Sequence, residues 1–494
     1  MSRLSRRRLL AVSGITVMSG LAAACGATAT PTATPAPQVA APTDTPAAAA
    51  ATEPTATTAA AEPTATTAAA EPTATTAAAE PTAAAAEAIN LRWWYGWGGS
   101  VDTTFKEVAK AFNEAHPGLV LEAIPGFESN DKLLTAIAGG DPPDIQAGNA
   151  TYMQFFSRGA ALPLSDMLDA STAVDKADYP PDLWRSMTWD GEIYGIPVLE
   201  AFARDALCYN PALLDAAGFS KPPETWDEAY EQHVKLTTFD SAGNVTMVGF
   251  DPMDAMGGSV GSADPFVWPP MWGFEFVDPD KKVFNLDNED FVEILTTIKR
   301  FYDVVGAEKM TAFRKTYGGW TGPQASFTVG VQAMQINGYW TPASMATDKP
   351  DVEFGYTWVP MPTKRKGVKL QITGGHAGFI PQNAKHPAES STGLEYLQGD
   401  EAFQMIYDGC GFIGGRISPL AKLDISKYPG LEFFVQSVKE ATELKGHEVN
   451  PVAATTSDVW IATVDAVNFG TMTPEAAATD MQDKMTKAMK DLLG

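Results

Sequence analysis

The most regular hydrophobic pattern in the chain lies near the start of its folded part, where short apolar runs alternate with amphipathic stretches. Leu91–Tyr95, Leu119–Ile124 and Asp144–Ala147 have the length and apolar content of buried strands. Between them, Asp102–Ala115 and Asp131–Ala138 carry apolar residues at three- and four-residue spacing, which predicts helices. This β-α-β-α-β order predicts a parallel sheet with helices on its faces.

Ligands of such sheets bind beyond the carboxyl ends of the strands. That rule selects three loops and these candidate residues: Trp94, Trp97, Glu128, Asn149 and Tyr152. Because side chains alternate along a strand, one of Trp93 and Trp94 should point into the core. We expect Trp94 and Trp97 to be exposed, although partial burial of the whole aromatic group is the alternative. A sugar packs its C–H face on such rings and directs its hydroxyls to Asn149, Glu128 or Glu200.

The pattern changes in the segment Trp189–Glu228, which divides the folded part of the chain. Two extended runs, Ile193–Leu199 and Ala206–Tyr209, lie on either side of a charged step from Glu200 to Asp205. A helix should then begin at Asn210-Pro211, because proline has no N–H to lose at a first helical position. Thr225 and Glu228 form a capping-box pattern for another helix.

The following region has the highest density of aromatic residues. In Asp264–Phe276, Trp268 and Trp272 either line a cleft or belong to a loop folded on its own hydrophobic cluster. The helix predicted over Glu289–Val305 has one apolar face and is core. The last predicted helix, Pro474–Leu493, has a face of methionine, alanine and leucine, which is typical of packing.

Several motifs resemble one known family. The segment Trp189–Glu228 contains YGIP, then YN, AG and PP-x-TWDE in that order. AFNEAHPGLVLE and AIAGGDPPDI lie upstream, and Gly330–Trp340 matches G-x-x-AM-x-x-x-G-x-W. From about Leu91 to the C-terminus, the chain resembles the extracellular solute-binding proteins of family 1, the maltodextrin-type receptors of ABC transporters.

The resemblance implies an α/β, two-lobed periplasmic-binding-protein fold of type II. Each lobe would hold a mixed, mostly parallel sheet flanked by helices, and three hinge crossings would join the lobes. Residues 89–200 and 361–400 would form lobe one, and residues 201–360 and 401–494 would form lobe two. A protein of this kind works as a monomer that captures a small-molecule solute, here a carbohydrate, and delivers it to the transmembrane subunits of an ABC permease.

The resemblance also implies site residues. Trp340 would stack on the ligand, and Gly375, in the family's GG strand, would let backbone N–H groups approach it. The adjacent His376 is either a donor in the cleft or a surface residue. Arg416 follows a turn in which the family's proline is missing, so its role stays open.

The first 88 residues have a different composition. Ser5–Leu10 resembles a twin-arginine export signal, and the small residues before Cys25 resemble a lipobox in which that cysteine is lipidated and anchors the protein to the membrane. Residues 26–88 repeat alanine, threonine and proline and should form a disordered tether. We therefore expect an exported lipoprotein on the outer face of the cytoplasmic membrane. A net charge of −25 argues against nucleic acid as a partner.

Two other functions remain open at this point, a carbohydrate-active hydrolase and a sensory or adhesion lipoprotein. Gly257–Gly261 matches Gly-x-Ser-x-Gly, but the flanking residues predict loop rather than the strand and helix of a nucleophile elbow. No motif for a metal, a phosphate loop or a cofactor is present, so we expect none of these and no catalytic residue. Cys208 and Cys410 are expected to be free thiols, although their pairing is conceivable in an exported protein.

Overall fold

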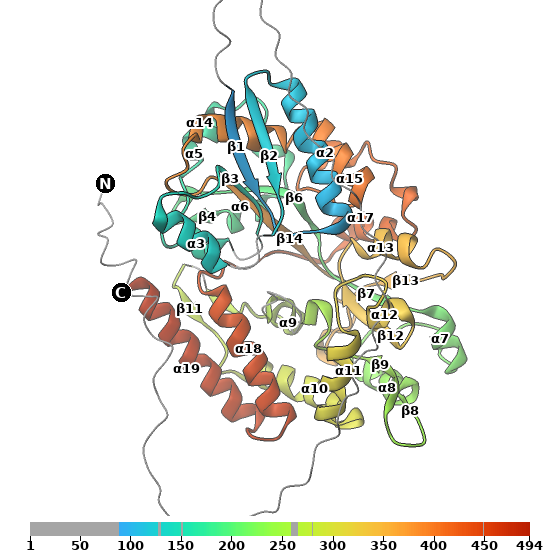
Figure 1. The fold of residues 1–494 in the computed structure, drawn as a ribbon. Coiled ribbons are helices and arrows are strands. Elements are labelled where there is room, and N and C mark those ends of the chain that lie inside the picture. Colours follow the sequence, from blue (N-terminus) through green and yellow to red (C-terminus); the bar gives the residue numbers. More distant parts are fainter. Residues whose placement is uncertain (1–87, 127–129, 150–151, 258–264, 279, 448) are drawn as a thin grey trace, which may run out of the picture. The chain divides into compact units, whose positions relative to one another are not determined.

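The computed structural model describes residues 88–494 except for 127–129, 150–151, 258–264, 279 and 448. Two separate sheets organise this part of the chain (Figure 1). The export signal, Cys25 and the Ala/Thr/Pro repeat lie outside the described residues.

The first sheet has six strands in the order β15-β14-β3-β1-β2, with β6 also pairing with β14. Its strands are β1 (Ile89–Trp94), β2 (Leu119–Ile124), β3 (Ile145–Asn149), β6 (Ile196–Ala203), β14 (Leu370–Phe379) and β15 (Glu443–Gly446). The predicted parallel core is confirmed, because β1 pairs in parallel with both β2 and β3. In contrast, β14 runs antiparallel to β3 and β6, since it re-enters this sheet from the other lobe.

Helices from several parts of the chain surround this first sheet. They are α2 (Gly99–Ala115), α3 (Asn130–Gly139), α4 (Met153–Phe156), α5 (Ser165–Ala170), α6 (Pro181–Ser186), α14 (Pro387–Tyr396), α15 (Asp400–Cys410), α16 (Ile417–Leu420) and α17 (Leu431–Glu440). The predicted helical face of α2 is buried, including Phe105, Val108 and Phe112. Helix α15 lies beside α2 although the two are far apart in sequence (Figure 1).

The second sheet has the order β13-β7-β12-β9-β8. Its strands are β7 (Ala206–Tyr209), β8 (Thr238–Phe239), β9 (Val245–Phe250), β12 (Gln332–Asn337) and β13 (Gly355–Thr357). Within the described chain only β9 and β12 pair in parallel here, so this sheet is mixed rather than mostly parallel. The reason is that β7 follows directly from the crossing out of the first sheet and runs against β12 and β13.

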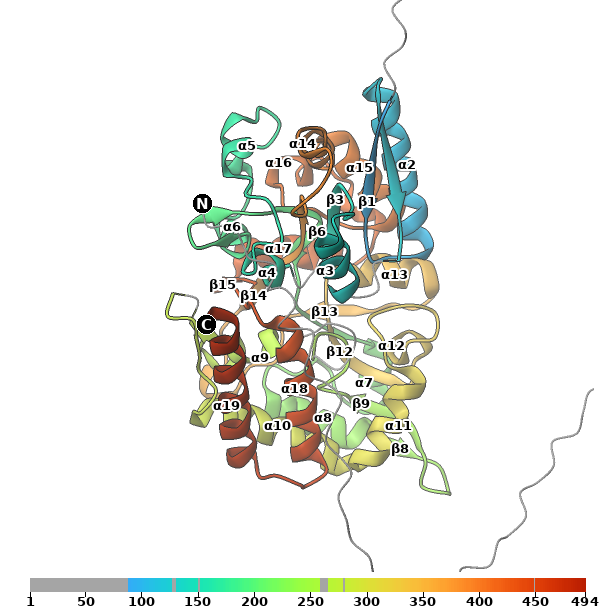
Figure 2. The same cartoon turned by 60° about the vertical axis from the view of Figure 1, so that its left-hand side comes forward.

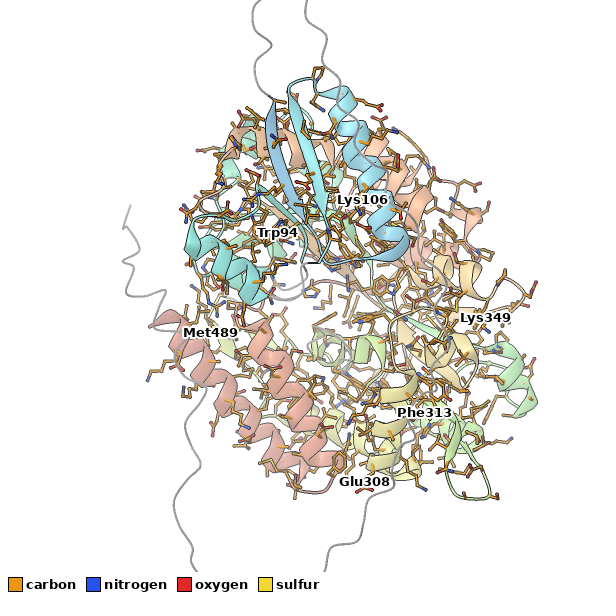
Figure 3. All side chains as sticks on the ribbon, viewed as in Figure 1. Trp94, Lys106, Glu308, Phe313, Lys349 and Met489 are labelled. Carbon is orange, nitrogen blue, oxygen red and sulfur yellow. The ribbon has the colours of Figure 1, made fainter. Side chains whose placement is uncertain are left out.

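Helices around the second sheet enclose the largest apolar cluster. They are α7 (Pro211–Ala216), α8 (Trp226–Leu236), α9 (Trp268–Trp272), α10 (Glu289–Val305), α11 (Ala307–Tyr317), α12 (Ser326–Val329), α13 (Thr341–Asp348), α18 (Ala453–Asn468) and α19 (Pro474–Leu493). Helices α18 and α19 pack side by side and both contact α10 (Figure 2). The methionine face of α19 is buried as predicted, and Met489 on it and Phe313 on α11 are both buried (labelled in Figure 3).

Two short hairpins complete the described fold. They are β4 (Thr188–Trp189) with β5 (Glu192–Ile193), and β10 (Val277–Asp278) with β11 (Val283–Phe284). Thr225 caps α8 as predicted, because its hydroxyl oxygen accepts from the backbone N–H of Glu228 at 3.2 Å.

The predicted lobe boundaries need one correction. Residues 401–446 were expected in lobe two, but β15 pairs with β14 in the first sheet, and α15 packs on α2. Helices α14 and α15 therefore both belong to the first lobe, where α14 contacts β3 and α15 contacts α2. The chain returns to the second lobe only at α18, whose contacts include α10 and α19.

Candidate ligand-binding site

The site is built where β6 leaves the first sheet. Strand β6 runs to Ala203, and only Arg204 and Asp205 separate it from β7 in the second sheet, so the charged step is shorter than predicted. Opposite β6, the register of β14 shifts between Gly375 and Ala377, and His376 lies at the shift. A bulge of this kind redirects side chains locally.

The bulge brings two predicted residues together. His376 Nδ1 lies 2.6 Å from Glu200 Oε2, although the two residues are distant in sequence. Leu199, just before Glu200, has a φ of 59°, in the left-handed region that a branched residue adopts only under constraint from its surroundings. The local backbone is therefore shaped to present the Glu200 carboxylate to His376.

Arg204 completes a buried charge cluster with these residues. Its Nη1 donates to Glu200 Oε2 at 2.8 Å, and both side chains are almost fully buried. Burial alone would raise the pKa of Glu200, but the Arg204 guanidinium and His376 together lower it to about 2. Glu200 is thus an anion at neutral pH, and its charge is balanced within the protein.

Aromatic rings surround the charge cluster. Trp340, which precedes α13, lies under Arg204, whose guanidinium carbon is 5.1 Å from the centroid of the indole ring. A Cβ on Gly338 would fall 2.3 Å from the Trp340 ring, so that glycine permits the observed position of the ring. On the side of the first sheet, the Trp97 ring lies 4.5 Å from the His376 ring, in an edge-to-face arrangement. Polar groups and flat apolar faces therefore adjoin one another at the crossing.

Some buried polar atoms of this cluster make no hydrogen bond within the described part of the protein. They are Glu200 Oε1, Arg204 Nε and both carboxyl oxygens of Asp205. Burial raises the pKa of Asp205 to about 7, an effect that Arg204 only partly offsets. Buried polar groups normally have partners, so this cluster retains a capacity for hydrogen bonding that the protein itself does not use.

Four of the predicted site residues thus meet at the crossing: Trp97, Glu200, Trp340 and His376. Trp94 is half-buried at the carboxyl end of β1 (labelled in Figure 3), while Trp93 is buried, as the predicted alternation requires. Lys132 Nζ lies 5.2 Å from the centroid of the Trp94 ring. Glu128 lies outside the described residues, and Asn149 ends β3 without a described side chain.

Three members of the cluster were not predicted. Arg204 lies four residues after Glu200 in the charged segment Glu200–Asp205, and this spacing of opposite charges was the sequence feature that could have indicated it. Asp205 lies beside it. Trp320 is in contact with Trp340, with ring centroids 5.9 Å apart, and its backbone oxygen accepts from Asn337 Nδ2. The only sequence feature that distinguishes Trp320 is the group of glycines around it.

Trp268 and Trp272 are not part of the cluster at the crossing, although Trp272 adjoins a small hollow of about 180 Å³. They are 0% and 3% exposed and belong to the main apolar cluster of the second lobe. Trp226 stacks on both of them, at centroid distances of 4.9 Å and 6.2 Å. The burial of Trp268 fits the alternative interpretation, in which this segment packs on its own hydrophobic cluster.

Three further candidate residues make close contacts with other parts of the protein. Tyr152 is buried, and its ring lies 5.5 Å from that of Phe156 in a tilted arrangement. A Cβ on Gly375 would lie 2.0 Å from the backbone oxygen of Glu200, so this glycine accommodates the neighbouring strand β6. Arg416 is held by Asp178, Asp400, Ser418 and the backbone oxygen of Gln398, which fixes the turn where the family's proline is missing.

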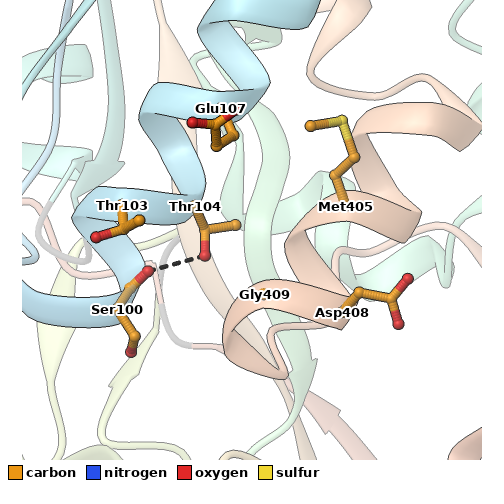
Figure 4. Close-up of a pocket in the computed structure, with 7 residues that line it drawn as sticks. All are labelled: Ser100, Thr103, Thr104, Glu107, Met405, Asp408 and Gly409. Carbon is orange, nitrogen blue, oxygen red and sulfur yellow. Dashed lines mark hydrogen bonds between the residues drawn. The ribbon is translucent and has the colours of Figure 1, made fainter.

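Two hollows of the described structure are lined by residues outside the cluster at the crossing. One, of about 180 Å³, is lined by Trp226, Asp227, Trp272, Glu293, Thr296, Thr297, Arg300, Pro362 and Thr363. The other, of about 630 Å³ between α2 and α15 (Figure 4), contains no predicted site residue and is lined by Ser100, Thr103, Thr104, Glu107, Met405, Asp408 and Gly409. Cys208 is buried and Cys410 half-buried, and both are free, as predicted. Within the described ranges, no helix has the length and apolarity needed to cross a membrane.

The nucleophile-elbow hypothesis for Gly257–Gly261 finds no support in its flank. Strand β9 ends at Phe250, well before this motif, and residues 258–264 lie outside the described part. A nucleophile elbow requires a strand that runs directly into the turn.

Comparison with known proteins decides the family. The family model for bacterial extracellular solute-binding proteins matches residues 96–402, more than half of the chain. The chain belongs to this family. The match covers strands of both sheets and includes Trp97, Glu200, Arg204, Trp340 and His376.

Relatives of this solute-binding protein are distant in sequence. An uncharacterised ABC transporter extracellular-binding protein of Pyrococcus horikoshii is 23% identical, over 69% of this chain and 75% of its own length. An uncharacterised lipoprotein from the oleD 5′ region of Streptomyces antibioticus is 32% identical, over 27% of this chain and 30% of its own length.

Solved structures share the fold of the solute-binding protein. CpMnBP1 with mannotriose bound has a TM-score of 0.71 and 22% identity, over 80% of this chain and all of its own. The maltose/maltodextrin-binding domain MalE of Bdellovibrio bacteriovorus, bound to maltotriose, has a TM-score of 0.64 and 19% identity, over 81% of this chain and all of its own. At these identities the likeness shows the two-lobed fold.

Proposed function

We propose that this solute-binding protein captures a neutral sugar or oligosaccharide between its two lobes and delivers it to an ABC permease. The observation that carries the proposal is the cluster at the crossing, where Glu200, Arg204 and His376 adjoin Trp97 and Trp340. Sugars need both of these features, since their C–H faces pack on aromatic rings and their hydroxyls bond to fixed polar groups. The oligosaccharides named for the structural neighbours support the same class of ligand.

The charge balance of the cluster favours an uncharged ligand. Glu200 and Arg204 neutralise each other at 2.8 Å, so neither group is left to compensate a ligand's ionic charge. A ligand that contacts both lobes stabilises their closed arrangement by its differential affinity for the two forms. Release then requires only that the permease favour the open form. The crossing at Arg204-Asp205 is one of the connections about which the lobes would move.

Export and lipid anchoring belong to the same proposal. The arginine-containing start, the apolar run and the small residues before Cys25 support export followed by lipidation of that cysteine. Residues 26–88, built on alanine, threonine and proline, would act as a flexible tether with a root-mean-square span of roughly 45 Å. Cys25→Ser should release the protein from the membrane fraction and abolish incorporation of a labelled fatty acid. Retention of both properties in this variant would refute the anchor.

A thermal-shift screen with product analysis tests the proposed function. The full chain is incubated with mannobiose, mannotriose, maltotriose, tagatose, spermidine and amino acids. An intact oligosaccharide present at a hundred times its Kd should raise the free energy of unfolding by about 2.7 kcal/mol and raise Tm accordingly. A shift with spermidine or amino acids alone would refute the carbohydrate class. Cleavage of an oligosaccharide would show a hydrolase instead.

A further inference from the structure

The loop that carries Trp320 is held in place by buried side chains. This loop, residues 318–322, follows α11 and is rich in glycine. Glycine has more conformational freedom to lose than any other residue, so a fixed position for Trp320 requires specific contacts. Trp320 in turn lies against Trp340, with ring centroids 5.9 Å apart in an edge-to-face arrangement. The loop therefore supports one side of the Trp340 ring.

Three supporting side chains bond to this loop, those of Asp254, Gln335 and Asn337. Gln335 and Asn337 lie two residues apart on β12, so they share one face of the strand. Their amide nitrogens donate to the backbone oxygens of Gly319 and Trp320. Asp254, which follows β9, accepts from the backbone N–H of Gly319 at 3.2 Å. The three side chains belong to residues that are 2%, 1% and 0% exposed, so water does not compete for these bonds.

The carboxylate of Asp254 sets the direction of the Gln335 amide. Gln335 Nε2 donates to Asp254 Oδ2 at 2.8 Å and to Gly319 O at 3.1 Å, and its Oε1 accepts from Asn337 Nδ2 at 3.1 Å. An ionised carboxylate can only accept, so it permits this one orientation. A protonated carboxyl group can donate to Oε1 and therefore also permits the reversed amide, which would lose its bonds to Gly319 and Asn337.

Asp254 changes its charge at mildly acidic pH. Burial and the neighbouring Asp251 carboxylate raise its pKa to about 6, and the Arg314 guanidinium on α11 only partly offsets them. Asp251 and Arg314 are bonded to each other at 2.8 Å. The other groups that contact the Asp254 carboxylate are neutral, namely the backbone N–H of Gly319, the Ser326 hydroxyl and the Gln335 amide. Below about pH 6 the orientation of the amide is no longer imposed.

We infer that Asp254 is a positioning residue, which through Gln335 and Asn337 holds Trp320 against Trp340, and that its protonation weakens this hold and with it the binding of the solute. The effect on binding rests on the proposed function, while the hold on the loop does not. Asp254 acts through the supporting side chains and the loop, so its role differs from that of the groups at the crossing.

Fluorine NMR of the full chain labelled with 5-fluorotryptophan tests the hold without any ligand. The Trp320 signal is assigned by its absence in Trp320→Phe. In the wild type this signal should shift between about pH 8 and about pH 5 with a midpoint near 6, and Asp254→Asn should show no such step. A Trp320 signal that does not change with pH, or that changes equally in the variant, would overturn the inference. Since burial makes the charge of Asp254 costly, a neutral asparagine should leave the protein folded.

Titration calorimetry with mannotriose measures the effect on binding. At about pH 8 Asp254→Asn should bind about fivefold more weakly than the wild type, a factor typical of one lost buried hydrogen bond. At about pH 5 the two proteins should bind alike, because the wild-type carboxyl group is then also neutral. Asp205 and His376 at the crossing are present in both proteins, so the difference between the two pH profiles isolates Asp254. Profiles that differ by the same factor at every pH would make Asp254 merely structural and refute the inference.

Asp465→Asn is a matched control. Burial also raises the pKa of Asp465, and Arg314 also offsets the effect, but this acid lies on α18 and is not one of the three supporting side chains. Its replacement should retain both the step in the Trp320 signal and the affinity of the wild type. If the Trp320 signal shows the step but no oligosaccharide binds the wild type, the proposed function fails while the hold on the loop stands. Binding of mannotriose without the step gives the opposite result.

Discussion

The molecule contains two groups of tryptophans that differ in what surrounds them. Trp226 stacks on both Trp268 and Trp272, and all three are almost fully buried within the apolar cluster of the second lobe. Trp97 and Trp340 are only partly buried. Trp97 adjoins the His376 ring, and Trp340 lies under the Arg204 guanidinium, which pairs with Glu200. The first group is packing, and the second is suited to binding.

The difference shows that aromatic density is a weak indicator of a binding site. Segment 264–276 is the richest in aromatic residues, yet its tryptophans stabilise the fold. Trp340 stands among fewer aromatic residues, and its value for binding comes from Arg204 and Glu200, which arrive from another strand. A ring becomes a candidate sugar platform when polar groups are fixed at its edge and when part of the ring is accessible.

The largest expected effect is the loss of stability when one tryptophan of the packing group (Trp226, Trp268 and Trp272) is replaced. Trp268→Ala removes a fully buried indole that stacks on Trp226, so the free energy of unfolding should fall by about 3–5 kcal/mol. Denaturant unfolding measures the loss. The fraction that remains folded should bind mannotriose with unchanged affinity. A specific loss of affinity in folded protein would place Trp268 in the binding group and remove the distinction.

The second prediction concerns the binding group. Trp340→Ala should weaken binding of mannotriose by about 2 kcal/mol, roughly thirtyfold, because the ring is the apolar face beside the fixed polar atoms. Titration calorimetry measures the affinity, and denaturant unfolding should show a smaller stability loss than for Trp268→Ala. Equal affinity of variant and wild type would move the site away from the crossing.

The third prediction uses the buried acid beside the binding group. The pKa of Asp205 is about 7 in the folded protein, against an ordinary value near 4 when unfolded. Between these values the unfolded state binds fewer protons, so this residue lowers stability as pH rises from about 4 to 7. Asp205→Asn removes the ionisation and should therefore be more stable than the wild type at pH 8, by about 1 kcal/mol or more.

Unfolding at two pH values checks the Asp205 prediction. At pH 4 the carboxyl group is protonated in the folded state, so most of the advantage of the variant should disappear. A stability difference that does not change between pH 4 and pH 8 would contradict the assigned cause, the burial of an unpartnered carboxylate.

The smallest effect is expected at Arg416. Its guanidinium bonds to Asp178 and Asp400 rather than to the cluster at the crossing. Arg416→Gln should leave the affinity for mannotriose unchanged and lower stability by at most about 1 kcal/mol, since partly exposed ion pairs contribute little. A clear loss of affinity in a stable Arg416→Gln variant would show instead that Arg416 takes part in ligand binding.

Sequence patterns predicted the elements well where the information is local. The helices α2 and α19 and the strands β1 and β2 follow from apolar periodicity and end within a few residues of the predicted bounds. Strand β15 was missed because Glu443–Gly446 is short and uniformly half-buried, with no alternation to reveal it. That omission moved the second lobe's boundary, since β15 holds residues 401–446 with the first sheet.

The site was predictable only in part. Glu200, His376, Trp97 and Trp340 were reached through loop position and family resemblance, but their mutual contacts depend on pairing between strands that lie far apart in the chain. Arg204 was missed because its importance comes from contact with Trp340, which no local pattern indicates. For the same reason the sequence could not show that the backbone of β6 already requires a glycine at position 375.

The structure of the protein with mannotriose bound tests the central claim most directly. The account predicts that the sugar lies at the crossing, beside Glu200, Arg204 and His376, with carbon atoms against Trp97 or Trp340. A sugar found between α2 and α15, or beside Trp268 and Trp272, would contradict it.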